Sequence, residues 1–570
     1  MVKKTLLASS ILLFTISTYL SAQPLADSIK KKLESFLAPW NMENSPGSSV
    51  GIIKNDSLIF VQSVGMANLE YNARNTPTTN FNIGSMAKQF TAFGIFLLEK
   101  EKKLFLHEDV RKYLPWLPKF EYKITLSDLI YHTSGLRDYL ILLQISGTRL
   151  EDIVTQEHVL KLISKQQRLN SIPGEKYAYS NSNYVLLAEV IQKVSGQKFR
   201  LFMDSAIFRP LGMTNSYFED NYSSVHQQRS YSYERIDSTH FRNIPLNYSV
   251  VGAGGMYSNV TDLAKWTTNF GTNRVWDKKT LQKLTTTVSL KNGRTLISAA
   301  GLVVQPYMGW RQYYFSGMDG GYRSFQNYFP DLRTGVIILS NLTDNLYNNN
   351  FPYGSTNILI PKDTTHWELM PRTWADSASA KINNPREYMR FVGDFISDEG
   401  GYPLSFKLIE DKMNVIVNGQ TNLMGRIQGD TFMTINSYQY RYVFNKSKTD
   451  TTITILAQDD SYTLRKLAKN PKSLNELQES FVGKYYCEEL DCIYSISLKD
   501  GKLLLQNNKY DDVNLNIIGV DHLGTNNWWM NHLSFFRKDG SVTGFEVNTG
   551  RVMHLNFKKI TSNAKQIFRD

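Results

Sequence analysis

The stretch FNIGSMAKQF, residues 81–90, places Lys88 three positions after Ser85 and joins a short β-like segment to an apolar run. That run, SMAKQFTAFGIFLLEKEKKL (residues 85–104), is apolar on nearly every side, which predicts a buried helix. Positions i and i+3 share one helix face, so we expect the Lys88 amine near the Ser85 hydroxyl. The helix therefore brings together a serine and a lysine at its first turn.

Such a pair can act as a nucleophile and its proton acceptor. The helix dipole stabilises an alkoxide at the N-terminus, and desolvation lowers the pKa of a buried lysine. The spacing alone is a weak signal, because Ser-x-x-Lys recurs at Ser28, Ser195 and Ser562. Its position before a buried helix is what distinguishes Ser85.

A second serine motif, GSSVG at residues 47–51, matches the Gly-x-Ser-x-Gly nucleophile elbow. That elbow needs a strand, a sharp turn and a helix. Alternating residues and an Asn55-Asp56 turn follow here instead, which predicts a β-hairpin. We interpret GSSVG as the entry to a strand.

The segment YAYSNSNY, residues 177–184, precedes a helical pattern that ends at Gly196. A phenol beside a cationic lysine is expected to have a lowered pKa, which would let Tyr179 act as a general base. The Asn181 amide can bind both a substrate carbonyl and the lysine. The alternative is an aromatic loop whose serine and asparagine cap the helix.

Taken in order, Ser85-x-x-Lys88 and Tyr179-x-Asn181 resemble the motifs of the penicillin-recognising serine hydrolases. This family includes class C β-lactamases, D-Ala-D-Ala carboxypeptidases, β-lactamase-like esterases and D-aminopeptidases. Three further segments are similar to the family's: LIYHTSGL (129–136), PGEKYAYSNSNY (173–184) and GAGGMYSNVTDLAKW (252–266). The resemblance covers residues 40–345 and implies an α+β fold, a β-lactamase/transpeptidase-like domain in which helices flank an antiparallel sheet.

The resemblance also implies roles for the residues of these motifs. Ser85 attacks a carbonyl and becomes acylated, while Lys88 and Tyr179 share the proton transfers. Asn181 orients the acyl side chain. His132 is expected to be structural, because its segment forms a wall of the site in relatives. No metal or organic cofactor is implied.

A third motif of the family departs from its usual form. Relatives carry Lys-Thr-Gly or His-x-Gly on the strand beside the serine, where this chain has Phe315, Ser316 and Gly317. The glycine lets substrate lie close to the strand. The backbone N–H groups of Ser85 and Met318 would form the oxyanion hole. Phe315 stands where relatives carry a lysine or a histidine, which argues against efficient recognition of β-lactams or terminal carboxylates.

The rest of the chain repeats itself. Similar segments begin at Phe391 and Phe481, and at Ser405 and Ser495, so both pairs are 90 residues apart. After a linker at residues 361–386, this predicts two all-β barrel-like domains, at 387–470 and 471–570. The arrangement resembles that of D-aminopeptidases, in which a loop of the last barrel reaches the active site and limits substrates to those with a free amine.

The first residues have the features of a signal peptide, residues 1–22, followed by the hydrolase domain at residues 23–360. Lys3 and Lys4 precede an apolar run, and Ala22 suits cleavage. No later stretch is long and apolar enough to span a bilayer, so the mature protein is expected in the periplasm or secreted, with no stable membrane span. Its excess of basic residues, +12 at pH 7, is scattered, which disfavours nucleic-acid binding.

The chain has two cysteines, Cys487 and Cys492. An exported protein can hold them as a disulfide across a tight hairpin, and two half-buried thiols are the alternative. The sequence leaves this choice and the oligomeric state open.

Together these patterns favour an exported serine hydrolase that acts through an acyl-enzyme. Its expected substrate is a small ester, a D-amino-acid amide or a peptidoglycan-derived peptide. One alternative is a cell-wall D,D-peptidase or weak β-lactamase. Another is a penicillin-binding-like sensor without turnover.

Overall fold

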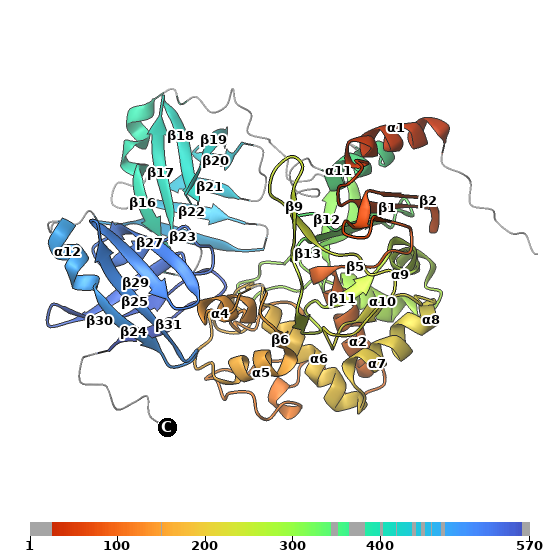
Figure 1. Ribbon diagram of the computed structural model, residues 1–570, viewed down its shortest axis with the longest axis horizontal. Coiled ribbons are helices and arrows are strands. Elements are labelled where there is room, and N and C mark those ends of the chain that lie inside the picture. Colours follow the sequence, from red (N-terminus) through yellow and green to blue (C-terminus); the bar gives the residue numbers. More distant parts are fainter. Residues whose placement is uncertain are drawn as a thin grey trace, which may run out of the picture.

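The computed structural model describes residues 26–149, 151–343, 351–363, 382, 384–398, 403–417, 419–435, 440–445, 451–457, 459–468 and 474–560 (Figure 1). The predicted signal peptide and most of the predicted linker fall outside these ranges. Within them, no helix has the length and apolar character needed to cross a bilayer. Figure 1 shows the two barrels on one side of the molecule and the helix-flanked sheet on the other.

The predicted α+β domain has a central six-stranded antiparallel sheet built from both ends of its sequence. The order is β12-β13-β14-β15-β1-β2, with β1 (Ser48–Lys54), β2 (Ser57–Val64), β12 (Val303–Tyr307), β13 (Trp310–Asp319), β14 (Tyr322–Phe329) and β15 (Thr334–Ser340). The predicted hairpin is β1–β2, and its turn residues Asn55 and Asp56 both have positive φ, as a tight turn requires. GSSVG lies along β1 and its approach, so the nucleophile elbow is absent there.

Helices cover both faces of this sheet. Because side chains alternate along a strand, Val336 and Ile338 of β15 pack against α1 (Asp27–Leu37), while Ile337 and Leu339 face the larger core. That core holds α2 (Ala87–Lys100), α3 (Leu126–Ile130), α5 (Gln156–Ser164), α6 (Asn181–Ser195), α7 (Phe199–Met203), α9 (Val260–Thr272) and α10 (Lys278–Thr285). The predicted helix at residues 85–104 starts as a 3₁₀ turn and continues as α2.

Helix α2 lies at the centre of the core, as its apolar sequence predicts. All of its residues from Ala87 to Phe96 are buried, including Lys88. Gly94 lets α6 approach, since a Cβ there would lie 3.0 Å from the Ile191 side chain. The two helices that carry the first and second motifs are therefore in direct contact.

Two closed eight-stranded antiparallel barrels follow, as the repeat predicts. Phe391 and Phe481 are fully buried in equivalent barrel cores, and the first strands begin at Gly393 and Gly483, both with positive φ. The first barrel comprises β16 (Gly393–Ile396), β17 (Leu404–Ile409), β18 (Lys412–Val417), β19 (Gln420–Gln428), β20 (Thr431–Thr434), β21 (Arg441–Asn445), β22 (Thr452–Leu456) and β23 (Ser461–Lys466). The second comprises β24 (Gly483–Cys487), β25 (Cys492–Lys499), β26 (Lys502–Asn507), β27 (Tyr510–Gly519), β28 (His522–Gly524), β29 (His532–Lys538), β30 (Ser541–Val547) and β31 (Leu555–Lys559).

The two cysteines face each other across the β24–β25 hairpin as free, buried thiols. Cys492 Sγ lies 3.8 Å from the carbonyl oxygen of Ile145, at the end of α4 (Tyr139–Ile145). A hydrogen bond with Cys487, together with burial, raises the pKa of the Cys492 thiol. The pair belongs to the contact between the second barrel and the α+β domain.

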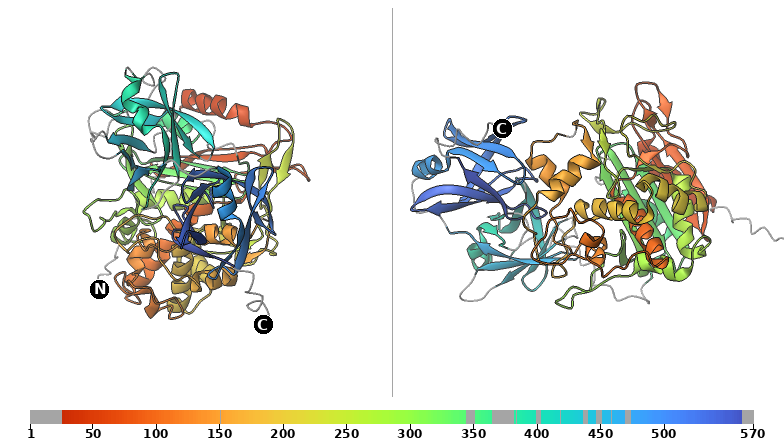
Figure 2. Two further views of the ribbon diagram at one scale, coloured as in Figure 1. Left: turned by 90° about the vertical axis from the view of Figure 1, so that its left-hand side faces the viewer. Right: turned by 90° about the horizontal axis from the view of Figure 1, so that it is seen from below.

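This contact is continuous with the core of the second barrel. Ile141, Leu142 and Ile145 of α4 belong to the same apolar cluster as the barrel interior, and the right-hand view in Figure 2 shows the blue barrel beside the orange helices of the α+β domain. Arg137, just before α4, is fully buried and lies 2.6 Å from Glu489 of the barrel. It also donates to the carbonyl oxygens of Met553 (2.9 Å) and His554 (2.8 Å), besides Gln166 Oε1 (2.9 Å). The apolar interface thus encloses an ion pair, Arg137–Glu489, whose arginine also makes three further hydrogen bonds.

We expect Arg137→Met to lower the free energy of unfolding by about 3 kcal/mol or more, because it leaves Glu489 buried without its cation. The measurement is urea unfolding followed by intrinsic fluorescence. Adding Glu489→Gln should recover part of this loss, since the two effects are not additive for paired residues.

The neighbouring pair Lys558–Glu488 supplies the control. Its side chains are 78% and 66% exposed and lie 3.7 Å apart, so Glu488→Gln should change stability by less than about 0.5 kcal/mol. An unchanged unfolding midpoint in Arg137→Met would show that the ion pair does not hold the barrel.

Candidate active site

Ser85 lies in the 3₁₀ turn Gly84–Met86 that begins α2. Gly84 has φ +51°, and its N–H donates to Asn82 Oδ1 at 2.8 Å. A Cβ on Gly84 would lie 2.8 Å from the backbone nitrogen of Met318. Glycine at this position therefore lets the 3₁₀ turn that carries Ser85 pack directly against strand β13, which borders the site.

Lys88 is the hub of the site's hydrogen bonds. Its Nζ lies 3.1 Å from Ser85 Oγ, 2.8 Å from Asn181 Oδ1 and 2.7 Å from the carbonyl oxygen of Ala253. Complete burial lowers its pKa to about 7, although Asp138 partly opposes the shift. A neutral amine has two hydrogens and one lone pair. Its hydrogens can serve the two carbonyl-type oxygens, which leaves the lone pair for the Ser85 proton.

Asp138 determines which way the Asn181 amide faces. Asn181, the first residue of α6, donates from Nδ2 to the two carboxylate oxygens of Asp138, at 2.9 and 3.2 Å. Asp138 is fully buried and also caps α4 by accepting from the backbone of Leu140. The amide oxygen of Asn181 is thereby turned toward Lys88. Sequence reasoning missed Asp138, whose only signal was an aspartate before a short apolar run.

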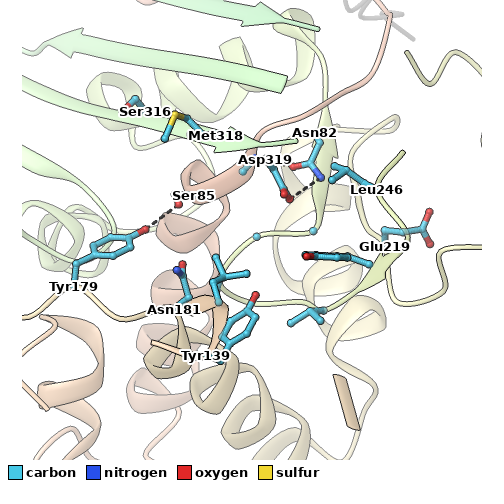
Figure 3. A pocket seen from close by; sticks show the side chains of 18 of the residues that line it. Asn82, Ser85, Tyr139, Tyr179, Asn181, Glu219, Leu246, Ser316, Met318 and Asp319 are labelled. Atoms are coloured by element: carbon cyan, nitrogen blue, oxygen red, sulfur yellow. Dashed lines mark hydrogen bonds between the residues drawn. The ribbon is translucent and has the colours of Figure 1, made fainter. Parts of the chain in front are cut away.

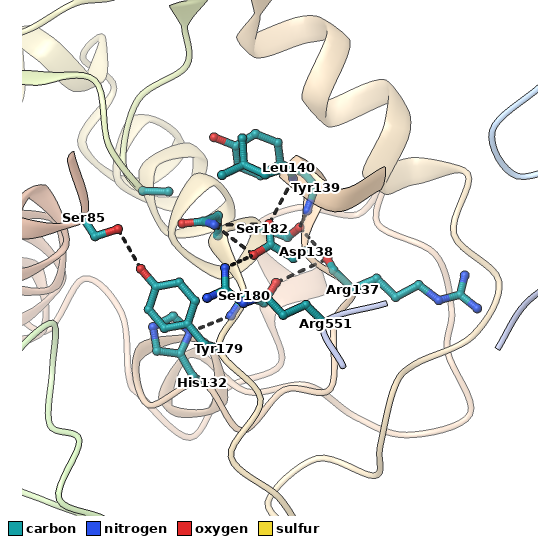
Figure 4. Close-up of polar contacts among 12 residues, drawn as sticks. Ser85, His132, Arg137, Asp138, Tyr139, Leu140, Tyr179, Ser180, Ser182 and Arg551 are labelled. Atoms are coloured by element: carbon teal, nitrogen blue, oxygen red, sulfur yellow. Dashed lines mark hydrogen bonds and ion pairs between the residues drawn. The ribbon is translucent and has the colours of Figure 1, made fainter. Parts of the chain in front are cut away.

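Tyr179 completes the contacts of the serine. Its hydroxyl donates to Ser85 Oγ at 2.8 Å (Figure 4). The sequence predicted a lowered pKa for this phenol, and that prediction is wrong. Burial raises the pKa of Tyr179 well above its usual value, and the opposing effects of Ser85 and Arg551 are smaller. Tyr179 is a protonated donor in the resting site.

His132 lies behind Tyr179. The two rings stack with their centroids 4.4 Å apart, and His132 Nδ1 accepts a hydrogen bond from the Ser180 N–H at 3.1 Å. Burial is the main cause that holds the pKa of His132 well below its usual value. The imidazole is therefore neutral and supports the tyrosine ring.

The third motif runs along β13 beside the serine. A Cβ on Gly317 would lie 2.0 Å from the Ile83 carbonyl oxygen and 2.9 Å from the Ser85 nitrogen. Because Gly317 has no Cβ, the backbone of Met318, the next residue, lies close to the backbone of Ser85. The sequence predicted an oxyanion hole formed by the N–H groups of these two residues. Phe315 and Ser316 line the cavity above Ser85, and the Phe315 side chain packs against the domain core.

The cavity above Ser85 has a volume of about 360 Å³ and two chemically different sides. Figure 3 shows Tyr179 on one side of Ser85, and Asp319, Glu219 and Leu246 on the other. Asp319 accepts from Asn82 Nδ2 at 3.2 Å, and burial raises its pKa to about 6.

Glu219, on the same side, lies 3.2 Å from Arg229 and 3.0 Å from His226, and burial raises its pKa. Sequence reasoning missed Glu219 and Asp319 alike. Asp319 lies two residues after Gly317 on one strand, so the shared strand face was the available signal for it.

Residues of the second barrel complete the cavity. Arg551, between β30 and β31, and Trp528, between β28 and β29, both line it. The carbonyl oxygen of Arg551 accepts from the Asp138 N–H at 3.1 Å and from Asn170 Nδ2 at 2.8 Å. Its guanidinium lies 3.5 Å from the Asp138 carboxylate and 4.9 Å from the centre of the Tyr179 ring (Figure 4). A loop of the last barrel thus reaches the cavity that Ser85 lines.

Comparison with known proteins places this geometry in context. Penicillin-binding protein 4* of Bacillus subtilis (strain 168) is 28% identical over 389 residues, which is 65% of this chain and 84% of that protein. The D-aminopeptidase of Gluconobacter oxydans (strain 621H) is 25% identical over 56% of this chain and 60% of its own length.

Two solved structures share the fold across the catalytic domain and beyond. The octameric penicillin-binding protein homologue from Pyrococcus abyssi has a TM-score of 0.52 at 22% identity and covers 77% of this chain and 99% of its own. SurE has a TM-score of 0.54 at 18% identity, with 77% and 98% covered. The beta-lactamase family model matches residues 29–350, more than half of the sequence. The chain belongs to the beta-lactamase family.

Proposed function

We propose that this protein is an exported serine hydrolase that cleaves small D-residue amides or esters through an acyl-enzyme on Ser85. The observation that carries the proposal is the pair of hydrogen bonds at Ser85 Oγ, one with Lys88 and one with Tyr179, at the base of an open cavity. A nucleophile within hydrogen-bond reach of its base is the arrangement that covalent catalysis needs.

The geometry supports one order of proton transfers. Neutral Lys88 accepts the Ser85 proton as Oγ bonds to the substrate carbonyl carbon, and the oxyanion lies toward the N–H groups of Ser85 and Met318. The Tyr179 phenol then gives its proton to the departing nitrogen or oxygen and regains one from the Lys88 ammonium. In deacylation, water takes the place of the leaving group and the same transfers run backwards. Tyr179 gives its proton to Lys88 and takes one from the water as the water oxygen bonds to the acyl carbon. Lys88 then returns a proton to Ser85 Oγ as its bond to the acyl carbon breaks, and the acid is released.

The position of Tyr179 also orients the substrate. The group that protonates the leaving atom must lie beside it, so the leaving group points toward Tyr179 and the acyl group toward Asp319 and Glu219 (Figure 3). Two partly buried carboxyl groups suit a free amine on the acyl residue. The D-aminopeptidase among the relatives supports this substrate class.

We expect Ser85→Ala to lower hydrolysis of D-alanine p-nitroanilide and p-nitrophenyl acetate by at least about 10³-fold. Intact-mass spectrometry of the unchanged protein should show a transient acyl adduct, and peptide mapping should place it on the peptide that contains Ser85. The control is Ser195→Ala, which alters another Ser-x-x-Lys of this chain at the end of α6 and should leave both rates unchanged.

The same experiment separates the alternatives. A sensor without turnover would give neither adduct nor product from either substrate. A second assay, labelling with a fluorescent penicillin, tests the other alternative. A β-lactamase or D,D-peptidase would be acylated rapidly by the penicillin. We expect no rapid labelling, because the aromatic Phe315 stands where relatives carry a lysine or a histidine.

The pH dependence should show Lys88 in every reaction and Asp319 only with amine substrates. Because neutral Lys88 is the base and its pKa is about 7, kcat/KM should rise about tenfold from pH 6 to pH 8 for p-nitrophenyl acetate and N-acetyl-D-alanine p-nitroanilide. The rise should be smaller for D-alanine p-nitroanilide, because its own ammonium group loses its proton at about pH 8. Asp319, with a pKa of about 6, should add a steeper fall below pH 6 for D-alanine p-nitroanilide and not for its N-acetyl derivative.

Asp319→Asn tests this assignment. It should remove a preference of at least about tenfold for the free amine, together with the steeper fall, and leave the rise near pH 7. The control is Asp331→Asn, whose side chain is 38% exposed and pairs with Arg311 outside the cavity. If Asp319→Asn kept the amine preference, another group would have to bind the amine.

A further inference from the structure

We propose that the cavity between the two barrels binds a neutral sugar of about disaccharide size, held by side chains from both barrels. The described residues that line this cavity all differ from those that line the Ser85 cavity. The proposed site is thus separate from the proposed hydrolase function and does not depend on it. It gives the barrels a binding role of their own, which would keep the α+β domain near a carbohydrate.

The cavity lies between the two barrels, which are next to each other at the left of Figure 1, and its volume is about 630 Å³. Strands β16 to β19 form its wall on the first barrel, and β27, β28 and the loop at residues 525–531 form it on the second. The barrels touch beside it, because a Cβ on Gly419 would lie 3.0 Å from the Asn526 side chain. A space of this volume between two domains is typical of small-molecule sites.

Side chains with amide and hydroxyl groups form much of the polar wall. They include Ser405, Thr421, Asn516, Asn526 and Asn531. Isoleucine side chains at positions 416, 517 and 518 supply apolar surface beside them. A sugar matches this mixture, because its hydroxyls both donate and accept hydrogen bonds and its ring carbons present an apolar C–H surface.

The charges of the wall favour a neutral ligand. The charged residues of its described part are Asp394 and Lys407, which have opposite signs. The Asp394 carboxylate accepts a hydrogen bond from Ser405 Oγ. An anionic or cationic ligand would therefore meet one favourable and one unfavourable charge, whereas a neutral ligand meets neither.

Asn531 lies in the wall with its amide unpaired. The residue is 2% exposed, and neither its amide oxygen nor its amide nitrogen has a hydrogen-bond partner among the described residues. Leaving both groups unpaired in a buried position costs free energy. Two adjacent hydroxyls of a sugar ring would satisfy them, because one can donate to the oxygen while the other accepts from the nitrogen.

A peptide suits the cavity less well than a sugar. Peptides often bind to β domains by adding a strand to the open edge of a sheet. Both barrels are closed, so the strands around the cavity pair with neighbours on both sides within each barrel. Recognition is therefore left to the side chains, which favours a ligand rich in hydroxyl groups over an extended peptide.

The loop at residues 525–531 connects this cavity to that of Ser85. Asn526 and Asn531 line the cavity between the barrels, and Trp528 of the same loop lines the Ser85 cavity. The loop closes on itself, because Thr525 Oγ1 donates to the carbonyl oxygen of Met530 at 2.7 Å and the Thr525 N–H donates to that of Asn531 at 3.1 Å. A bound sugar would thus contact a compact loop that also borders the Ser85 cavity.

Saturation-transfer NMR on the full chain tests the proposal, with cellobiose and N,N′-diacetylchitobiose as neutral disaccharide probes. At least one of them should bind with a Kd of about 1 mM or lower. Asn531→Leu should weaken this binding at least about tenfold, because it removes both amide groups. The melting temperature of Asn531→Leu should equal or exceed that of the unchanged protein, since leucine has a similar volume and leaves no polar side-chain group unpaired.

Asn516 and Asn514 provide a matched pair of variants. Both are exposed on β27, and Asn516 lines the cavity whereas Asn514 does not. Asn516→Leu should weaken sugar binding at least about threefold, and Asn514→Leu should change it by less than about 1.5-fold. Thr421→Val should also weaken it at least about threefold, because the proposal needs side chains from the first barrel as well.

Hydrogen exchange followed by mass spectrometry gives a second measurement. The bound sugar should slow exchange at least about threefold in peptides that contain residues 404–407 and 524–531, and Asn531→Leu should abolish this protection. Ser85→Ala should retain both the binding and the protection, so loss of hydrolysis and loss of sugar binding are separate outcomes.

Three results would overturn the proposal. The first is no saturation transfer to either disaccharide. The second is equal binding of the disaccharides by the unchanged protein, Asn531→Leu and Asn516→Leu. The third is binding of trialanine and of neither sugar, with protection of the same peptides, which would make the cavity a peptide site.

Discussion

The buried amine of Lys88 is the constraint on which the rest of the site depends. An ammonium in an apolar helix core is costly, so burial favours the neutral amine, whose two hydrogens are both accepted. Asn181 and the carbonyl oxygen of Ala253 accept them. Segments far apart in the chain must therefore converge on one face of α2, and the remaining lone pair faces Ser85.

Close backbone packing positions the second acceptor, the carbonyl oxygen of Ala253. Gly252, beside Ala253, has φ +98°, and a Cβ there would lie 2.3 Å from the Tyr184 carbonyl oxygen of α6. The carbonyl oxygen of Gly252 also accepts from Thr91 Oγ1 of α2 at 2.8 Å. A larger residue at position 252 would move the acceptor away from Lys88. The glycine-rich segment thus joins α2 and α6 around the base.

Local patterns in the sequence predicted much of this arrangement and missed what depends on distant packing. The β1–β2 hairpin, buried helix α2 and the repeated barrels were readable because each follows from periodicity or self-similarity. The pKa of Tyr179 was predicted in the wrong direction, since burial by residues from several segments outweighs its cationic neighbours. Asp138 and Arg551 were missed because single polar residues 413 positions apart carry no local signal.

The contact between barrel and catalytic domain links stability to chemistry. The α+β domain supplies the proposed nucleophile, the proposed base and the phenol, whereas the guanidinium of Arg551, 4.9 Å from the centre of the Tyr179 ring, comes from the second barrel. Arg137 and Glu489 hold that barrel in register by a buried ion pair, and the same arginine holds the backbone that follows Arg551. A change in this interface would therefore move a charge at the active site. The second barrel is therefore part of the site, because Arg551 and Trp528 line the same cavity as Ser85 and Phe315.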